Sequence, residues 1–152
     1  MQLTRAADYA VRVMIHLATL PAGTRLNRDN LATASEVPTH FLSKVLQVLV
    51  RARLIVAHRG PSGGFALAIP AEQVSVLRVV EAVEGPIVLN ACMTNGLGCS
   101  RQGWCPAHLV WLEAQAALTQ VLKNASIGRL ATQATALRGD GPRQDKVVYP
   151  WN

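Results

Sequence analysis

All three cysteines of this 152-residue chain lie in one short stretch, and a histidine follows just beyond it. Six residues separate Cys92 from Cys99, five separate Cys99 from Cys105, and His108 comes three residues later. Soft thiolates on a glycine-bearing loop suit zinc or an iron-sulfur cluster, because both bind sulfur and both need a backbone that wraps closely around them. Three thiols are one ligand short of the usual four. The fourth ligand is therefore the main chemical question that the sequence raises.

Two other kinds of cysteine chemistry compete with a cluster. A structural zinc site would use the three cysteines and His108, but zinc ligands usually come as two close pairs, and this spacing has none. A thiol switch would instead join two cysteines on oxidation. An odd number of cysteines in one loop argues against a framework of internal disulfides and favours a reducing, cytoplasmic setting.

The positive charge is concentrated in the first half of the chain. The net charge is +6, and residues 1–70 carry eight basic and three acidic side chains, a net +5. Such an asymmetry is typical of a nucleic-acid-binding module joined to a different element. On charge alone, a solvated basic face is an equal alternative.

The elements of the first half predict how that charge is used. Helical spacing begins after Thr4, and Asp8 and Arg12 stand four residues apart, as in an ordinary surface ion pair. Asn27 can cap a second helix, and a third begins near Thr39 after the corner at residues 36–38. The third helix leaves a polar face that suits the major groove, as in a helix-turn-helix. The residues of that face are Thr39, His40, Ser43, Lys44 and Gln47.

A β-hairpin is predicted directly after this helix. Residues 54–58 and 64–67 resemble strands, and the basic, glycine-rich stretch Arg59-Gly-Pro-Ser-Gly-Gly64 joins them. A phosphate-binding loop is the alternative, but it would need a helix afterwards, whereas a strand follows. The order predicts a winged helix, with Arg59, Gly60 and Ser62 contacting the DNA backbone or the minor groove.

The second half is predicted to hold a sensing loop and a dimer helix. A helix capped by Ser75 ends at Gly85-Pro86, and another runs from Pro106 to Lys123 with apolar residues on more than one face. Pairing with a second copy would cover such a helix, and a central core helix is the alternative. We expect a mainly α fold with a small β-hairpin, divided into a winged helix-turn-helix (1–85), a cysteine loop (86–105), a dimerisation helix with a short helical turn (106–131) and a mobile tail (132–152).

The sequence argues against several classes of function. The apolar runs are too short for a membrane span, and the amino terminus lacks a signal-peptide core, which predicts a soluble cytoplasmic protein. No paired acids, Ser/His/Asp order or phosphate loop occurs in a suitable context. We therefore expect neither an enzyme nor a small-molecule substrate.

Four motifs in order identify a family. These are the opening Met-Gln-Leu-Thr-Arg-Ala-Ala-Asp-Tyr-Ala-Val-Arg, the helix Phe41-Leu-Ser-Lys-Val-Leu, the wing Arg59-Gly-Pro-Ser-Gly-Gly-Phe and the three-cysteine loop. Together they resemble the Rrf family of bacterial winged-helix regulators, which includes IscR, NsrR and RirA, over residues 1–131. The resemblance implies a homodimer that binds operator DNA, with an iron-sulfur cluster held by Cys92, Cys99 and Cys105.

The resemblance leaves two candidates for the fourth ligand. Asp8 stands where NsrR-like proteins supply an aspartate from the partner subunit to a four-iron cluster, and His108 stands where IscR-like proteins use a histidine for a two-iron cluster. A carboxylate would leave one iron labile, whereas a histidine would raise the potential. Asp8 and a four-iron cluster are favoured, because histidine-type relatives generally lack an acid at that position. The resulting hypothesis is a regulator, and more specifically a repressor, that senses nitric oxide, redox state or iron supply.

Overall fold

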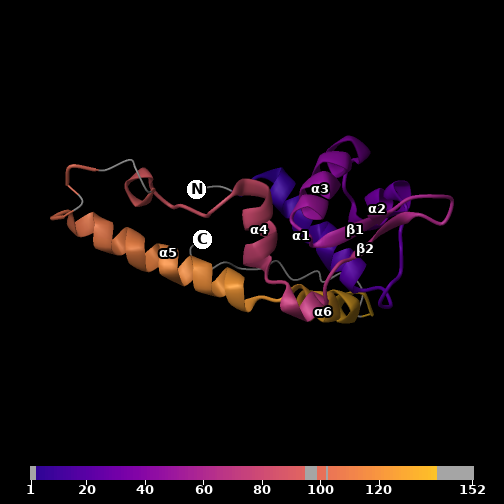
Figure 1. Cartoon of the computed structure of the whole chain (residues 1–152). Helices are drawn as coiled ribbons and strands as arrows, with labels where there is room; N and C mark the ends of the chain where they lie inside the picture. Colours follow the sequence, from indigo (N-terminus) through magenta and orange to yellow (C-terminus); the bar gives the residue numbers. More distant parts are fainter. Residues whose placement is uncertain (1–2, 95–98, 102, 140–152) are drawn as a thin grey trace.

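The computed structural model describes residues 3–94, 99–101 and 103–139, and these form a mainly helical fold with one β-hairpin, as the sequence predicts. Figure 1 shows how its helices and strands are arranged in space. In chain order they are α1 (Arg5–Ala18), α2 (Arg28–Ser35), α3 (Thr39–Arg51), β1 (Ile55–His58), β2 (Gly64–Leu67), the 3-10 helix η1 (Ala71–Gln73), α4 (Val76–Glu84), the 3-10 helix η2 (Ala91–Met93), α5 (Pro106–Asn124) and α6 (Ile127–Gly139).

Three of the helices begin at the residues that the sequence predicts. The side chain of Thr4 accepts a hydrogen bond from the Ala7 N–H at 3.3 Å, and Asn27 and Ser75 cap α2 and α4 in the same way. Each cap satisfies an N–H group that would otherwise lack a partner at a helix start. Local hydrogen bonding therefore defines the starts of α1, α2 and α4.

Helices α1 to α3 and the hairpin enclose the main core. Buried apolar side chains from α1, α2, α3 and β1 meet there, and α4 and α6 add one residue each; the fully buried ones include Met14, Leu31, Leu42, Leu49, Leu54, Ile55, Val79 and Ile127. Strands β1 and β2 are antiparallel, with Ile55 opposite Leu67. Phe65 of β2 also exchanges two backbone hydrogen bonds with Leu26, which fastens the hairpin to the segment before α2.

An arm projects from this winged-helix body. In Figure 1 the chain leaves α4, runs outward through η2, and returns along α5, which extends well beyond the other helices. Within the described chain no residue of α5 is buried, although Leu118 and Leu122 pack against a small second cluster of Ala7, Val80 and Ile87. The alternative of a central core helix is therefore wrong for the single chain.

Helix α6 corrects one sequence prediction. A short turn at residues 127–131 and a mobile tail from residue 132 were expected, but the helix continues to Gly139. It packs against α1 and η1 and buries Ile127 and Ala131, and its later residues include good helix formers such as Ala134 and Ala136. Tertiary packing thus extends a weak local signal. Residues 140–152 of the predicted tail lie outside the described residues.

Among the described residues, no helix is both long enough and apolar enough to cross a bilayer.

Candidate metal centre and nucleic-acid interface

The three cysteines line one small cavity at the outer end of the arm. Cys92 lies in η2, Cys99 lies in the loop, and Cys105 immediately precedes α5. The cavity has a volume of about 210 Å³. Its lining consists of Asn90, Cys92, Cys99, Cys105, His108 and Trp111. Residues that are up to 21 positions apart in the sequence therefore share one site.

His108 is placed among the thiols by the first turn of α5. Its Nδ1 lies 3.6 Å from Cys92 Sγ, and its backbone N–H donates to the Cys105 carbonyl at 3.1 Å. Pro106 occupies the first position of the helix, where its fixed φ angle favours helix initiation and its missing N–H costs nothing. The start of α5 thus sets the histidine beside Cys92.

The thiols are reduced and unequal in exposure. All three cysteines are free, Cys99 is exposed, and Cys92 and Cys105 are half-buried. In the described part of the chain, no three His, Cys, Asp or Glu side chains are close enough to share a single metal ion. The donor set around the cavity fits an iron-sulfur cluster in kind, because three thiols and an imidazole surround it and a cluster spans more space than one ion.

Asp8 does not belong to the cysteine cavity of its own chain. It lies on the exposed side of α1, and its Oδ2 is 2.9 Å from Arg12 Nε. The predicted surface ion pair is confirmed. A ligand role for Asp8 would require a second copy of the chain and stays a prediction.

The predicted DNA-reading residues form one polar surface. Thr39, His40, Lys44 and Gln47 are exposed on α3, and Ser43 is half-buried beside them. At the corner before α3, Glu36 takes a left-handed conformation with φ 54°, which ends α2 abruptly. The chain therefore turns in one residue and presents α3 outward, as a helix-turn-helix requires.

The wing follows α3 directly in the chain. Arg59, Gly60 and Ser62 are exposed at the hairpin tip, where Gly60 has φ 101° and its carbonyl accepts from the Gly63 N–H at 2.9 Å. A positive φ suits glycine, since it lacks a Cβ. The tip thus exposes a guanidinium, a hydroxyl and backbone groups that can reach phosphates.

Two arginines that the sequence pattern does not single out lie beside α3. Arg28 begins α2 and Arg51 ends α3, and both line a groove of about 450 Å³ that also includes Ser43, Gln47 and Phe65. The side chain of Arg28 is 55% exposed, and its Nε lies 3.4 Å from a carboxylate oxygen of Asp29. The position of Arg28 directly after the Asn27 cap was the available signal, because cations there lie beside the reading helix.

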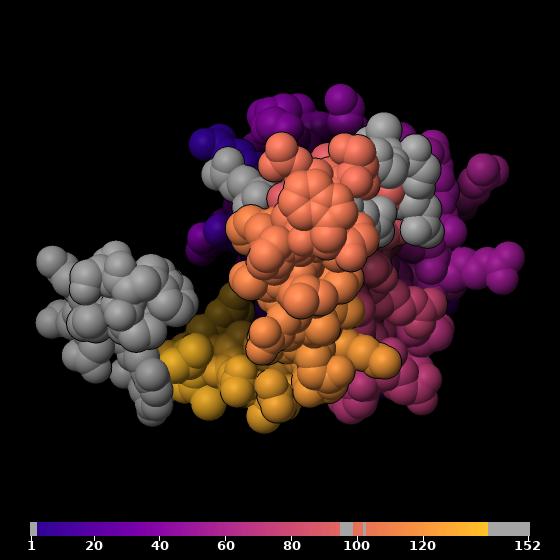
Figure 2. Space-filling view, turned by 90° about the vertical axis from the view of Figure 1, so that its left-hand side faces the viewer, coloured from indigo at the N-terminus to yellow at the C-terminus, as the bar shows by residue number. Residues whose placement is uncertain are grey.

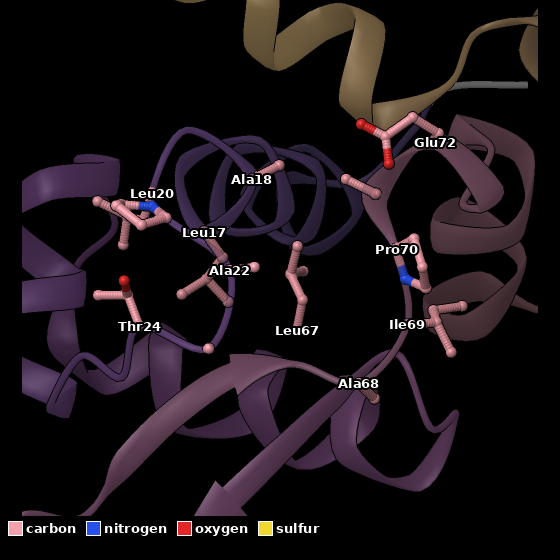
Figure 3. A pocket seen from close by; sticks show the side chains of 13 residues that line it. Leu17, Ala18, Leu20, Ala22, Thr24, Leu67, Ala68, Ile69, Pro70 and Glu72 are labelled. Atoms are coloured by element: carbon pink, nitrogen blue, oxygen red, sulfur yellow. The ribbon is translucent and has the colours of Figure 1, made fainter.

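Another cavity is lined by few groups that could react or bind a ligand. About 430 Å³ in volume, it lies between the end of α1 and the segment from β2 to η1 (Figure 3). Apolar side chains such as Leu17, Leu67 and Ile69 dominate its lining, and Glu72 is the single ionisable residue among those that line it. Neither a catalytic set nor a ligand set is assembled there.

A helix-turn-helix followed directly by a hairpin wing defines the class of winged-helix transcriptional regulators. The family model of Rrf2, described as an iron-dependent transcriptional regulator, matches residues 3–133. This chain belongs to the Rrf2 family.

Similar proteins agree with that assignment. A Mycobacterium tuberculosis protein named as an HTH-type transcriptional regulator is 34% identical over 133 residues, which cover 86% of this chain and 81% of the relative. IscR of Cronobacter sakazakii is 27% identical, covering 90% and 84%. Among solved structures, CymR, the global cysteine regulator of B. subtilis, has a TM-score of 0.72 at 20% identity, covering 88% of this chain and 98% of CymR. T. potens IscR has a TM-score of 0.67 at 18% identity, covering 100% and 97%.

Proposed function

We propose that this protein is a dimeric, operator-binding repressor whose DNA affinity depends on an iron-sulfur cluster held by Cys92, Cys99 and Cys105. The observation that carries the proposal is the convergence of three free thiols and His108 on one cavity. The fourth ligand is either Asp8 of the partner subunit, which favours a four-iron cluster, or His108, which favours a two-iron cluster. A bound cluster would supply a reactive iron site that responds to nitric oxide, redox state or iron supply.

The proposal that the protein is a dimer is supported by the outer face of α5. Leu109, Val110 and Val121 are 68%, 58% and 66% exposed, and Leu112 is 45% exposed. Figure 2 shows this helix, in orange, at the front of the molecule. The other described residues do not cover its outer surface in this view. Exposed apolar side chains along a long helix favour a protein interface, and a twofold dimer would present two DNA-binding modules to two half-sites.

The proposal that the protein binds operator DNA is supported by the charge and shape of the winged-helix body. Exposed polar side chains lie on α3, Arg59 is exposed on the wing, and Arg28 and Arg51 line one groove together with Ser43 and Gln47 of α3. Phosphate contacts would supply affinity, and Ser43, Lys44 and Gln47 would read base edges. The intact chain should therefore bind a double-stranded operator with strong salt dependence.

Anaerobic purification tests the cluster. Brown protein with comparable amounts of iron and acid-labile sulfide is expected, and addition of nitric oxide or a chelator should change both its visible spectrum and its operator affinity. Colourless protein with one zinc per chain would instead establish a structural zinc site and overturn the proposal.

A thiol switch is the second candidate. The exposure of Cys99 favours it, as does the likeness to Staphylococcus aureus CymR, whose structure is known in an oxidized form. Metal-free protein that loses two thiols on mild peroxide treatment and then changes its operator affinity would establish this mechanism.

A further inference from the structure

One face of α5 carries its contacts with both the cysteine cavity and the second apolar cluster. His108 and Trp111 line the cysteine cavity at one end of this face, and Leu118 and Leu122 pack against the second apolar cluster at the other. Gln115 lies between them. Spacings of three and four residues place these five side chains on one side of a helix.

The Gln115 side chain binds the segment that leads to the cysteine loop. Its Oε1 accepts a hydrogen bond from the Leu89 N–H at 2.9 Å, and its Nε2 donates to the Ile87 carbonyl at 2.5 Å. The two partners are backbone groups of alternate residues, 28 and 26 positions away in the sequence. One planar amide thus satisfies a donor and an acceptor of the same extended segment, which fixes both its position and its register.

Register matters because Cys92 follows Leu89 by three residues. The segment from Ile87 to Asn90 belongs to no helix or strand, so it has no ladder of its own to hold it against α5. The opposite wall of the cavity, Cys105 and His108, belongs to the start of α5 itself. The bonds of Gln115 therefore join the two walls, beside the packing of Ile87 in the second apolar cluster, and Cys92 Sγ lies 3.6 Å from His108 Nδ1 across the cavity.

We propose that Gln115 is a positioning residue that holds Cys92 in register with Cys105 and His108, so that the thiols of the cavity are preorganised for a common ligand. The identity of this common ligand as an iron-sulfur cluster rests on the proposed function. The register itself is a property of the chain and can be measured without a metal.

The test uses the full-length, reduced, metal-free protein. Gln115→Met keeps the length of the side chain and removes both hydrogen bonds, whereas Gln115→Glu keeps an acceptor for Leu89 and loses the donor to Ile87. Gln120→Met is the matched control, because Gln120 lies on the same helix and its amide bonds at 2.8 Å to Asn124 on the exposed surface. Alkylation rates of Cys92 and Cys99 are followed by peptide mass spectrometry, with circular dichroism to verify helix content.

Gln115→Met should raise the Cys92 rate several-fold relative to Cys99, Gln115→Glu should lie between that variant and the wild type, and Gln120→Met should match the wild type. An unchanged ratio of rates in folded Gln115→Met would overturn the proposal. If Gln115→Met does not fold, the ratio in Gln115→Glu decides in the same way.

A second measurement links the register to the cluster. After anaerobic reconstitution with iron and sulfide, Gln115→Met should lose its visible absorbance to a chelator several-fold faster than both the wild type and Gln120→Met, and equal rates would contradict preorganisation. Wild-type protein that takes up no iron and sulfide would refute the proposed cluster, while the alkylation ratio would still test Gln115.

Discussion

Arg12 Nε lies 2.9 Å from Asp8 Oδ2, one turn further along α1. The two side chains are 46% and 52% exposed, so solvent screens the pair, and such helix pairs contribute only about 0.3–0.5 kcal/mol. The carboxylate is therefore held in place without being buried. It stays accessible to a second molecule, at a small cost for exchanging its partner.

Replacing Asp8 tests the preferred fourth ligand. Asp8→Asn keeps the size of the side chain but provides a much poorer iron ligand, so the Mössbauer and resonance Raman spectra of the cluster should change and chelation should accelerate. Arg12→Met is the control, because it breaks the ion pair and keeps the carboxylate. That variant should retain the wild-type spectrum and lose no more than about 0.5 kcal/mol of stability.

His108→Ala provides the comparison. If the histidine is the ligand, this variant and not Asp8→Asn will show the altered spectrum. Wild-type spectra for both variants would mean that neither residue binds iron.

Arginines around α3 should contribute additively to operator binding. Arg59→Ala and Arg28→Ala should each weaken binding across sequences and reduce the slope of log affinity against log salt by about 1, as expected for one lost phosphate contact. Arg78→Ala, an exposed arginine on α4 outside the reading surface, should leave the slope unchanged. Titrations by fluorescence anisotropy at several salt concentrations measure this, and equal slopes for all proteins would exclude these contacts.

The exposed face of α5 should control the oligomeric state. Val110→Glu places a charge where the proposed interface excludes water, and sedimentation velocity should show a shift from dimer to monomer. Leu137→Glu is the control, because Leu137 is also exposed and apolar, at 42%, but lies on α6. A monomeric wild type would refute the proposed dimer, and a dimeric Val110→Glu variant would place the interface elsewhere.

His16 should make the stability depend on pH. Its pKa is lowered below the ordinary 6.5 by burial and then by the positive charge of Arg138, and its Nδ1 is buried without a hydrogen-bond partner among the described residues. Arg12, Glu36 and Arg138 line the same cavity as His16, and Asp8 pairs with Arg12.

As the pH falls below about 6.5, the unfolded chain binds a proton that the folded chain resists, so the native state should lose stability. His16→Gln should flatten the dependence of the unfolding midpoint in urea between pH 7 and pH 5. Parallel curves for the two proteins would show that His16 plays no part.

The fold was accessible from the sequence because its signals are local. Thr4, Asn27 and Ser75 cap the helices that follow them, and the apolar spacing of α1, α3 and α4 matches their buried faces. Helix α6 was underestimated because its stability comes from packing on α1 and η1, which no local pattern reveals.

The candidate site also combines features that local sequence signals predict with features that depend on tertiary packing. Sequence alone determined the donor set, the polar face of α3 and the basic wing, since these follow from residue type and periodicity over a few residues. Only the tertiary structure brought Cys92, Cys99, Cys105 and His108 to one cavity, left Asp8 outside it, and placed Gln115 against Ile87 and Leu89. The physical reason is that contacts between residues far apart in the sequence depend on how α5 packs against the chain before it, and side-chain hydrogen bonds to distant backbone leave no periodic trace in the sequence.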